Sequence, residues 1–390
     1  MNKKTIVSIL LAVFVYIFFT GVSYFLLSTK AQTQKITTSS SGAPVANVNG
    51  KTVFSPTLPK TEACPLNGVL YPKVQKDWWD KHRPLGVMIE NHQNARPQSG
   101  LSSADVIYEA VAEGSITRFL AVFYCQDAGQ VGPVRSARTY FLDFISEYGS
   151  NPLYAHVGGA NTPGPADALS QITQYDWTGY NDLNQFSIGF PVFWRDYNRL
   201  GHETATEHTM YSATEKLWTF AGASRGLTNV DKDGVSWDKN FVPYGFTDDA
   251  ASAKPTAQTI HLEFWASYSD YFVDWSYDKA SNSYKRSNGK AAHIDLDNNK
   301  QLNAKNIVVL FMKQSNANDG YEDNVHLLYT TKGTGRAIIF KDGMEIKGTW
   351  SKNTRTSRTL LFDSNGNPIK FNRGLIWFEI LPTDGVVSVK

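Results

Sequence analysis

Side chains that could carry acid–base chemistry or bind a ligand are concentrated between residues 90 and 138. They combine carboxylates, amides, an imidazole and guanidinium groups, and they are Glu90, Asn91, His92, Arg96, Gln98, Glu109, Glu113, Arg118, Arg135 and Arg138. We interpret this cluster as a binding or catalytic site, because sites are commonly built at strand ends and in the loops that follow them. A buried ion-pair network would explain the same residues, and the sequence leaves that alternative open.

The first candidates follow directly on an apolar run at residues 85–90. Glu90, Asn91 and His92 together could orient a sugar hydroxyl or move a proton. The simpler alternative is a turn in which Asn91 bonds its own backbone and His92 is merely exposed. Close by, Pro97 restricts the backbone between Arg96 and Gln98, which favours a guanidinium held in one place.

The carboxylates of the cluster are the candidates for catalysis, with His92 as a further candidate base. Glu109 lies within a predicted strand at residues 106–112, where it either pairs with an arginine or faces a cleft. Glu113 and Arg118 flank a predicted hairpin turn and could pair across it. The sequence therefore leaves open whether the protein is an enzyme.

Arg135, Ser136 and Arg138 lie at the predicted start of a helix, at residues 136–149. Free backbone N–H groups and the helix dipole favour anions at such a position. Two guanidinium groups added there favour carboxylate or phosphate binding over internal pairing.

Two further polar segments are included among the ligand-binding candidates. The glycine-rich loop at residues 156–165, which begins with His156, precedes another predicted helix and is expected to form a second anion pocket. It lacks the Lys-Ser/Thr of a P-loop. Arg195 belongs to a polar group at residues 193–209. The histidines of that group lack the spacing of a helical zinc motif, so we expect neither a metal site nor a cofactor.

The pattern of predicted elements indicates an α+β fold. Residues 77–223 alternate strands and helices and are expected to form a mixed α/β N-terminal domain with a sheet plus helices. Residues 258–390 read as short strands separated by turn signals, among them Asp342-Gly343 and Asn365-Gly366, and predict a β-rich C-terminal domain. Residues 224–257 are expected to be a connection.

The N-terminus predicts a single transmembrane helix. Residues 5–28 carry no charge and are long enough to cross a bilayer, so residues 1–30 are expected to be a cytoplasmic tip and an uncleaved anchor. Lys3 and Lys4 precede the span and place the N-terminus in the cytoplasm and the bulk of the chain outside. A cleaved signal peptide is the alternative. Residues 31–76 are polar and are expected to be a flexible tether.

Charge and cysteine content limit the remaining possibilities. The formal net charge is +2, which gives no argument for a nucleic-acid partner. Cys64 and Cys125 are the two cysteines of the chain. They either form a disulfide, which the predicted location outside the membrane allows, or remain as free buried thiols.

Several long segments carry a family resemblance. They are RPLGVMIENH, ARPQSGL, ADVIYEAVAEGSITRFLAVF and GPVRSAR in the first half, and KNIVVLFMK, GTGRAIIFKDG, GTWSK and GLIWFEILP in the second. Over residues 80–385 the chain resembles the YerB-like family (domain of unknown function 3048), whose members are described as bacterial lipoproteins. The resemblance implies an α+β fold and a location in the cell envelope, and it supplies no reaction.

Three functional hypotheses follow. The first is a membrane-anchored extracytoplasmic protein that binds an anionic or hydroxyl-rich envelope ligand, such as peptidoglycan, in a polar cleft of the N-terminal domain. The second is a cell-wall hydrolase or lyase that uses a glutamate of that cleft. The third is a scaffold that docks a protein partner of the envelope.

Overall fold

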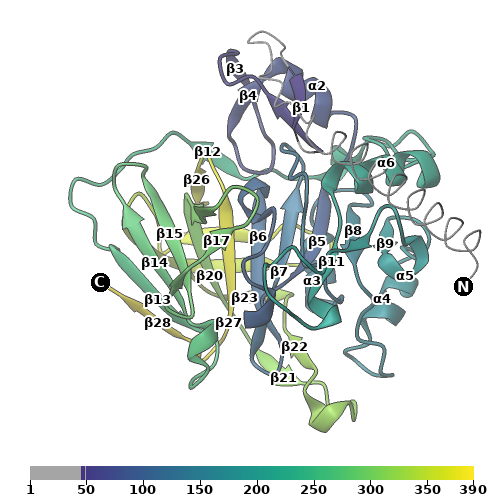
Figure 1. Ribbon diagram of the computed structural model, residues 1–390. Helices are drawn as coiled ribbons and strands as arrows, with labels where there is room; N and C mark the ends of the chain where they lie inside the picture. Colours follow the sequence, from purple (N-terminus) through teal and green to yellow (C-terminus); the bar gives the residue numbers. More distant parts are fainter. Residues whose placement is uncertain (1–44, 49) are drawn as a thin grey trace, which may run out of the picture. The chain divides into compact units, whose positions relative to one another are not determined.

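The computed structural model describes residues 45–48 and 50–390, and a ten-stranded mixed sheet is its main element (Figure 1). The strand order is β25-β24-β23-β20-β27-β6-β7-β5-β8-β9. In chain order the strands are β5 (Leu85–Glu90), β6 (Val106–Glu113), β7 (Ile116–Phe123), β8 (Leu153–His156), β9 (Asp182–Asn184), β20 (Asn306–Met312), β23 (Gly333–Lys341), β24 (Met344–Lys352), β25 (Leu360–Asp363) and β27 (Ile376–Pro382).

The centre of this sheet is covered on both faces. Every residue of β5, β20 and β27 is buried, which explains why these strands read as continuous apolar runs rather than alternating ones. Helix α3 (Thr139–Ile145) packs against this core. Tyr108 of β6 stacks on Phe144 of α3 and on Phe378 of β27, with ring centroids 4.8 and 4.7 Å apart.

The strand directions bring six strand ends to one edge of the sheet. Strand β27 is parallel to both of its neighbours, β20 and β6. The hairpin β6–β7 is antiparallel, and β7 is antiparallel to β5, so β5 runs in the same direction as β6. Strands β8 and β9 continue parallel to β5. The carboxyl ends of β20, β27, β6, β5, β8 and β9 therefore lie along a single edge, which we call the carboxyl edge.

A second, antiparallel sheet comes from the C-terminal half, in the order β16-β15-β14-β13-β28, with β19 paired to β15. Its strands are β13 (Thr259–Glu263), β14 (Val273–Asp278), β15 (Ser283–Asn288), β16 (Ala291–Ala292), β19 (Asn303–Ala304) and β28 (Val386–Val389). Trp275 of β14 packs edge-on against Trp377 of β27 at 5.3 Å, so the two sheets share apolar contacts.

Short elements complete the described chain. The remaining helices are α2 (Lys73–Trp79), α4 (Ala168–Gln174), α5 (Gln185–Ile188) and α6 (Thr214–Arg225). The remaining strands are β1 (Val45–Val48), β2 (Lys51–Phe54), β3 (Lys60–Ala63), β4 (Leu70–Pro72), β10 (Trp194–Arg195), β11 (Met210–Tyr211), β12 (Gly245–Thr247), β17 (Ile294–Asp295), β18 (Lys300–Gln301), β21 (Gln314–Asn316), β22 (Leu327–Tyr329) and β26 (Lys370–Asn372).

The predicted fold class needs a correction. Mixed α/β structure with a β-rich C-terminal part is present, but the class also included a single transmembrane helix. Across residues 45–48 and 50–390, no helix is long and apolar enough to cross a membrane. The predicted span at residues 5–28 lies outside the described residues, and the single-pass assignment that rested on it has no support from the structure.

The segment expected to be a tether, residues 31–76, carries structure in its second half. Strands β2, β3 and β4 form there, and a disulfide joins Cys64 to Cys125, with 6.0 Å between the two Cα atoms. Asn67 donates to the buried carboxylate of Asp105 at 2.7 Å. This part of the chain is fixed to the large sheet because a covalent bond and a buried hydrogen bond both reach it.

Both predicted domains contribute strands to the large sheet. Strands β5 to β9 come from residues 77–223, and β20 to β27 come from residues 258–390. The connection at residues 224–257 thus separates two segments of chain whose strands pair directly, β27 with β6. The predicted domain boundaries themselves stay a prediction.

Candidate functional site

The predicted polar cluster divides into a closed interior part and an open part. The closed part is a ring of six hydrogen-bonded side chains, which we call the buried ring. Four of its residues come from the first half of the chain and two from the second, and they are Asn91, Gln98, Thr117, Glu109, Arg286 and His293. Each of them is buried.

The donors and acceptors of the ring are mutually consistent. Arg286 donates from Nη2 to Oε2 of Glu109 at 2.6 Å and from Nη1 to Nδ1 of His293. His293 in turn bonds Oε1 of Gln98 through Nε2, at 2.7 Å. Burial and the guanidinium of Arg286 lower the pKa of His293 well below its usual range. The imidazole is therefore neutral, and it accepts at Nδ1 and donates from Nε2.

The other half of the ring closes on the same carboxylate. Gln98 donates to Oδ1 of Asn91 at 3.0 Å, and Asn91 donates to the Thr117 hydroxyl at 2.7 Å. Thr117 donates to Oε1 of Glu109 at 2.7 Å. Because the buried charge of Glu109 is both paired and hydrogen-bonded, it meets the condition under which a charge can be kept in a protein interior.

A second buried carboxyl group lies beside the ring. Trp275 donates to Oε1 of Glu379 at 2.9 Å. Burial and the neighbouring Glu109 raise the pKa of Glu379 well above its usual range, which favours the protonated form of this carboxyl group. The Arg286 guanidinium lies 4.7 Å from the centroid of the Trp377 ring, which adds a cation–π contact to its ion pair.

Five predicted site residues therefore form hydrogen bonds with other groups of the protein. Asn91, Gln98 and Glu109 are members of it. Arg96 donates from Nη2 to the backbone oxygens of Asn91 and Asp270, both at 3.0 Å. His156 is buried elsewhere, between the Gly158 carbonyl and the Asp182 carboxylate at 2.6 Å each. The alternative of a structural network holds for this part of the cluster.

Glu113 forms a second closed group with two arginines. Arg118 contacts its Oε2 at 3.4 Å, which is the pairing expected across the hairpin, and Arg138 pairs with its Oε1. Arg118 also donates to the carbonyl of Ser136 at 3.0 Å. Glu113 is thereby paired with two guanidinium groups.

The open part of the cluster is a cavity of about 570 Å³ at the carboxyl edge, which we call the Arg135 pocket. It lies where β8 and β9 end, the position at which parallel sheets commonly hold ligands. Its lining residues are Arg135, Ser136, Val157, Gly158, Gly159, Asn161, Leu169, Asn184, Phe186, Arg195, Glu207 and Met210.

Backbone pairing fixes the wall that carries Arg135. The amide of Arg135 donates to the carbonyl of Met88 in β5 at 2.9 Å, and the amide of Val157 donates to the carbonyl of Arg135 at 3.0 Å. The segment thus runs extended between the ends of β5 and β8. Helix α3 begins at Thr139, so Arg135 and Ser136 precede it, and the prediction that they form a helix N-terminus is wrong.

Beneath the pocket wall, Arg135 is held by a buried carboxylate. Its Nε pairs with Oε2 of Glu90, whose side chain is 1% exposed, while the Arg135 side chain is 28% exposed. His208 approaches the same oxygen at 3.5 Å, and its ring stacks on His92 at 4.7 Å. Burial raises the pKa of Glu90, but His208, Arg135 and Arg118 overcome this and lower it to about 2.

Glu90 is therefore ionised at neutral pH and serves as the anchor of Arg135. The pair leaves part of the guanidinium facing the pocket, because Glu90 engages only Nε in a salt bridge. Arg195, which also lines the cavity, is exposed and donates to the hydroxyl of Thr209 at 3.2 Å. Two cations thus face the cavity beside the single carboxylate of Glu207.

Sequence reasoning missed the apolar and amide groups of the pocket. Phe186 is 76% exposed, although it is a large aromatic residue, and it lies beside the Gly158 backbone. Gly158 has a φ of +58°, and a Cβ placed there would lie 3.0 Å from the Phe186 ring. Asn184 accepts from the amides of Gly158 and Phe186 through Oδ1, both at 3.2 Å. The Gly158-Gly159 pair in the predicted anion loop was the one signal for this wall.

Sequence reasoning also missed Arg286, His293 and Glu379, which close the interior around Glu109. For Glu379 a signal existed, because an isolated carboxyl group in the apolar run IWFEILP implies a buried partner. Nothing in the sequence pairs Arg286 with Glu109, which lies 177 residues away.

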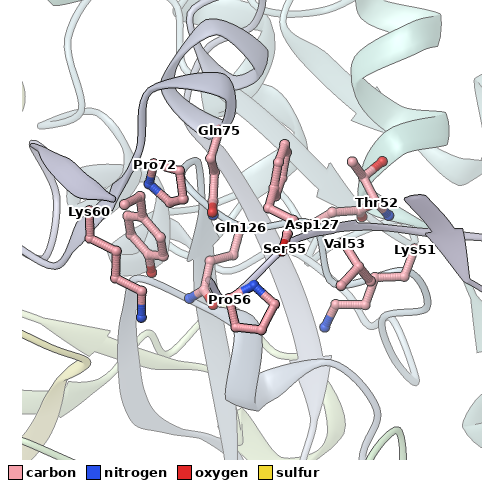
Figure 2. A pocket seen from close by; sticks show the side chains of 12 residues that line it. Lys51, Thr52, Val53, Ser55, Pro56, Lys60, Pro72, Gln75, Gln126 and Asp127 are labelled. Atoms are coloured by element: carbon pink, nitrogen blue, oxygen red, sulfur yellow. The ribbon is translucent and has the colours of Figure 1, made fainter. Parts of the chain in front are cut away.

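A smaller cavity of about 230 Å³ lies between β2, β4 and α2 (Figure 2). Lys51 and Lys60 lie at opposite ends of it, with Gln75, Gln126 and Asp127 between them. The polar groups are largely engaged internally. Lys51 donates to Ser103 at 2.8 Å, and the Asp127 carboxylate accepts from the amide of Thr52 at 2.6 Å. We assign this cavity to the docking of β2 rather than to a ligand.

Comparison with known proteins agrees with this architecture. Residues 72–228 match the family model described as "Protein of unknown function (DUF3048) N-terminal domain", and residues 260–378 match its C-terminal domain. The Bacillus subtilis (strain 168) protein described as "Putative lipoprotein YerB" is 26% identical over 336 residues, which are 86% of this chain and 90% of that protein.

The fold is also similar to that of a solved structure. The crystal structure of YerB protein from Bacillus subtilis superposes with a TM-score of 0.67 at 24% sequence identity. The superposition covers 84% of this chain and 100% of that chain.

Proposed function

The chain belongs to the DUF3048 family, and from that premise we propose that it is an extracytoplasmic protein of the cell envelope that binds a cell-wall polymer in the Arg135 pocket. The ligand class is a glycan that carries both hydroxyl and carboxylate groups, as peptidoglycan does. The observation that carries the proposal is the pairing of two pocket-facing cations with an exposed aromatic ring at the carboxyl edge.

The cations supply recognition of carboxylates. Arg135 is fixed by its buried partner Glu90, so little side-chain entropy is lost when it binds an anion. A guanidinium can donate two parallel hydrogen bonds to one carboxylate. Arg195 provides a second such group in the lining of the cavity.

The remaining walls suit a sugar ring. The exposed face of Phe186 offers apolar area on which a pyranose can stack, and it lies next to the amides of Asn161 and Asn184. The side-chain amide of Asn184 uses its oxygen in the protein, which leaves its NH₂ group available to a ligand hydroxyl or acetamido oxygen.

Two observations support a location outside the cytoplasm. The YerB relative carries the description of a lipoprotein. The Cys64–Cys125 disulfide is of a kind that forms and persists in oxidising compartments and is rare in the cytosol.

The alternatives of a hydrolase or lyase and of a protein-docking scaffold draw less support. Glu109 is sealed in the buried ring, Glu113 is paired with two arginines, and Glu90 is ionised against Arg135. A general acid in such an enzyme needs a raised pKa and access to the substrate, and none of these three carboxylates has both. For a scaffold, no partner surface is indicated as strongly as the Arg135 pocket.

Binding of the full-length protein to purified peptidoglycan sacculi tests the proposal in a sedimentation assay. Removing both pocket cations with Arg135→Ala plus Arg195→Ala should weaken retention by about a hundredfold, since each charged hydrogen bond contributes roughly 1.5–3 kcal/mol. The single variant Arg195→Ala leaves the Glu90 pair intact and should lose about tenfold by the same reasoning.

The matched control removes two positive charges elsewhere. Lys285 and Lys347 have side chains that are 50% and 78% exposed, so Lys285→Ala plus Lys347→Ala changes net charge equally without touching the pocket. Retention that falls equally in the control and in the pocket variant would show nonspecific charge attraction. Release of soluble fragments by the wild type, abolished by Glu90→Gln, would favour the hydrolase instead.

A further inference from the structure

A second cavity lies at the carboxyl edge, on the side of the sheet built by the C-terminal half. It has a volume of about 490 Å³ and is bounded by the ends of β20, β24 and β27 and by the start of β23. Strands β20 and β27 are parallel neighbours, so the cavity occupies the same kind of position as the Arg135 pocket, beyond the carboxyl ends of parallel strands.

The charged and hydroxyl-bearing side chains that line this cavity can all donate hydrogen bonds. They are Lys313, Thr330, Thr334, Arg336 and Thr383. No carboxylate lines the cavity. All five side chains are exposed, and within residues 45–48 and 50–390 neither of the two cations has a carboxylate within 4 Å. An excess of cations and hydroxyl donors over carboxylates is the electrostatic requirement of an anion site.

The cavity has a rigid aromatic base. The guanidinium carbon of Arg336 lies 3.6 Å from the centroid of the Phe311 ring, so the cation is held over that ring. Trp350 donates from its indole nitrogen to the carbonyl of Phe311 at 3.0 Å. Trp350 faces Gly335 across the strand pair, and a Cβ at Gly335 would lie 2.5 Å from that nitrogen. Glycine is needed there for the indole to lie flat, and this fixes the position of Phe311 beneath Arg336.

We propose that this cavity, which we call the Arg336 site, binds a tetrahedral oxyanion of the phosphate or phosphodiester class. Its donors come from four separate segments of chain. A planar carboxylate presents its acceptors in one plane, whereas a phosphate group presents oxygens toward all sides of the site. The hydroxyls bond oxygens that the two cations do not reach.

The inference is independent of the proposed function, because the two cavities share no residue. Strands β20 and β8 are separated by five steps in the strand order. At about 4.8 Å per step the two cavities are roughly 24 Å apart along one edge. Either site can therefore be removed without altering the other.

Calorimetric titration of the full-length protein at low ionic strength tests the Arg336 site. The probes are inorganic phosphate and a glycerophosphodiester, each compared with chloride at the same ionic strength. We expect saturable binding of phosphate with a Kd on the order of 1 mM or tighter. Arg336→Gln and Lys313→Gln should each weaken it by about tenfold, because each removes one charge-assisted hydrogen bond.

Lys347→Gln on β24 is the control, since its side chain is 78% exposed and outside the cavity, and it should bind phosphate as the wild type does. Thr334→Val keeps both charges and should weaken phosphate binding severalfold. This variant distinguishes a specific binding site from nonspecific electrostatic attraction. Tighter binding of the diester than of free phosphate would identify a polymer ligand, and the reverse a free anion. Binding no stronger than that of chloride, or unchanged in Arg336→Gln, would overturn the proposal.

Discussion

Two consecutive residues at the end of β5 belong to different regions, one to the Arg135 pocket and the other to the buried ring. Glu90 ends β5 and anchors Arg135 at an open cavity, whereas Asn91 turns into the interior and joins Glu109 and Arg286. Both regions contain a glutamate–arginine ion pair, Glu90–Arg135 in one and Glu109–Arg286 in the other. What differs is the origin of the partner: Arg135 lies 45 residues beyond Glu90, while Arg286 comes from 177 residues beyond Glu109. The Glu109–Arg286 pair joins two distant parts of the chain in the interior, whereas the Glu90–Arg135 pair leaves its arginine partly exposed at the cavity.

The largest expected effect tests the interior. Arg286→Met removes the only cation of the buried ring and leaves Glu109 buried without its ion pair. We expect the free energy of unfolding to fall by about 3–5 kcal/mol, as is typical when one partner of a buried pair is deleted. Urea unfolding at pH 7 measures it.

The neighbouring residue provides the control for Arg286. Lys285 has a side chain that is 50% exposed, and Lys285→Met should change stability by less than about 0.5 kcal/mol. A loss below about 1 kcal/mol in Arg286→Met would mean that the buried pair contributes little to stability, and the contrast between interior and pocket would weaken.

The next effect concerns Glu90, which lies at the boundary between the two regions. Its pKa in the folded protein is about 2, below its ordinary value, because His208, Arg135 and Arg118 outweigh the effect of burial. A lowered pKa stabilises the fold at pH values above the ordinary pKa, and this contribution is lost as pH falls toward 2. Glu90→Gln should therefore cost roughly 3 kcal/mol at pH 7 and about half as much at pH 3.

Urea unfolding of the wild type and of Glu90→Gln at both pH values gives this difference. His92→Gln is a suitable control, since His92 stacks on His208 but is not part of the Glu90–Arg135 ion pair. A difference that stays constant from pH 7 to pH 3 would show that the Glu90 carboxylate is not the charge that holds Arg135.

The smallest effect on stability is expected in the pocket itself. Phe186 is 76% exposed, so Phe186→Ala should change the free energy of unfolding by less than about 0.5 kcal/mol. It should nevertheless weaken sacculus binding severalfold, because the ring is the apolar platform of the pocket. Phe190 is 84% exposed and does not line the cavity, which makes Phe190→Ala the matched control. Equal retention of both variants would remove Phe186 from the site.

Local structure could be predicted well where a single segment determines it. The apolar run at 85–90 coincides with β5, and the predicted strand GLIWFEILP at 374–382 contains β27, because strands buried on both faces need continuous apolar sequence. The Asp342-Gly343 turn was predicted from its residue types, and both residues have positive φ, +57° and +77°. These features depend on neighbours in the chain alone.

Helix α3 shows where local reasoning fails. The pattern predicted a start at residue 136, but the helix starts at Thr139. The preceding residues are helix-compatible by type, yet the amide of Arg135 is bonded to Met88 and the amide of Ala137 to the carbonyl of Gly158. Pairing with distant strands outweighs the local preference for helix, and that pairing leaves no mark in the sequence.

The site was predictable in part for the same reason. Arg135, Ser136, Arg195 and the Gly158 loop were expected to bind a ligand, and the structure brings them to one cavity. Whether Glu109 faced a cleft or a partner could not be decided, because the answer lies in Arg286 on β15. Placing that residue requires the order of strands in two sheets, which no local pattern encodes.

The position of β27 has a consequence for how the protein is made. This strand lies between β20 and β6 in the sheet but follows both of them in the sequence. A chain that emerges from the ribosome or a translocon amino end first thus exposes the bare edge of β6 until residues 376–382 have been made. Unpaired edges invite intermolecular pairing, so the nascent chain should depend on holding chaperones. A premature stop shortly before residue 376 would yield an aggregating product rather than a shorter working one.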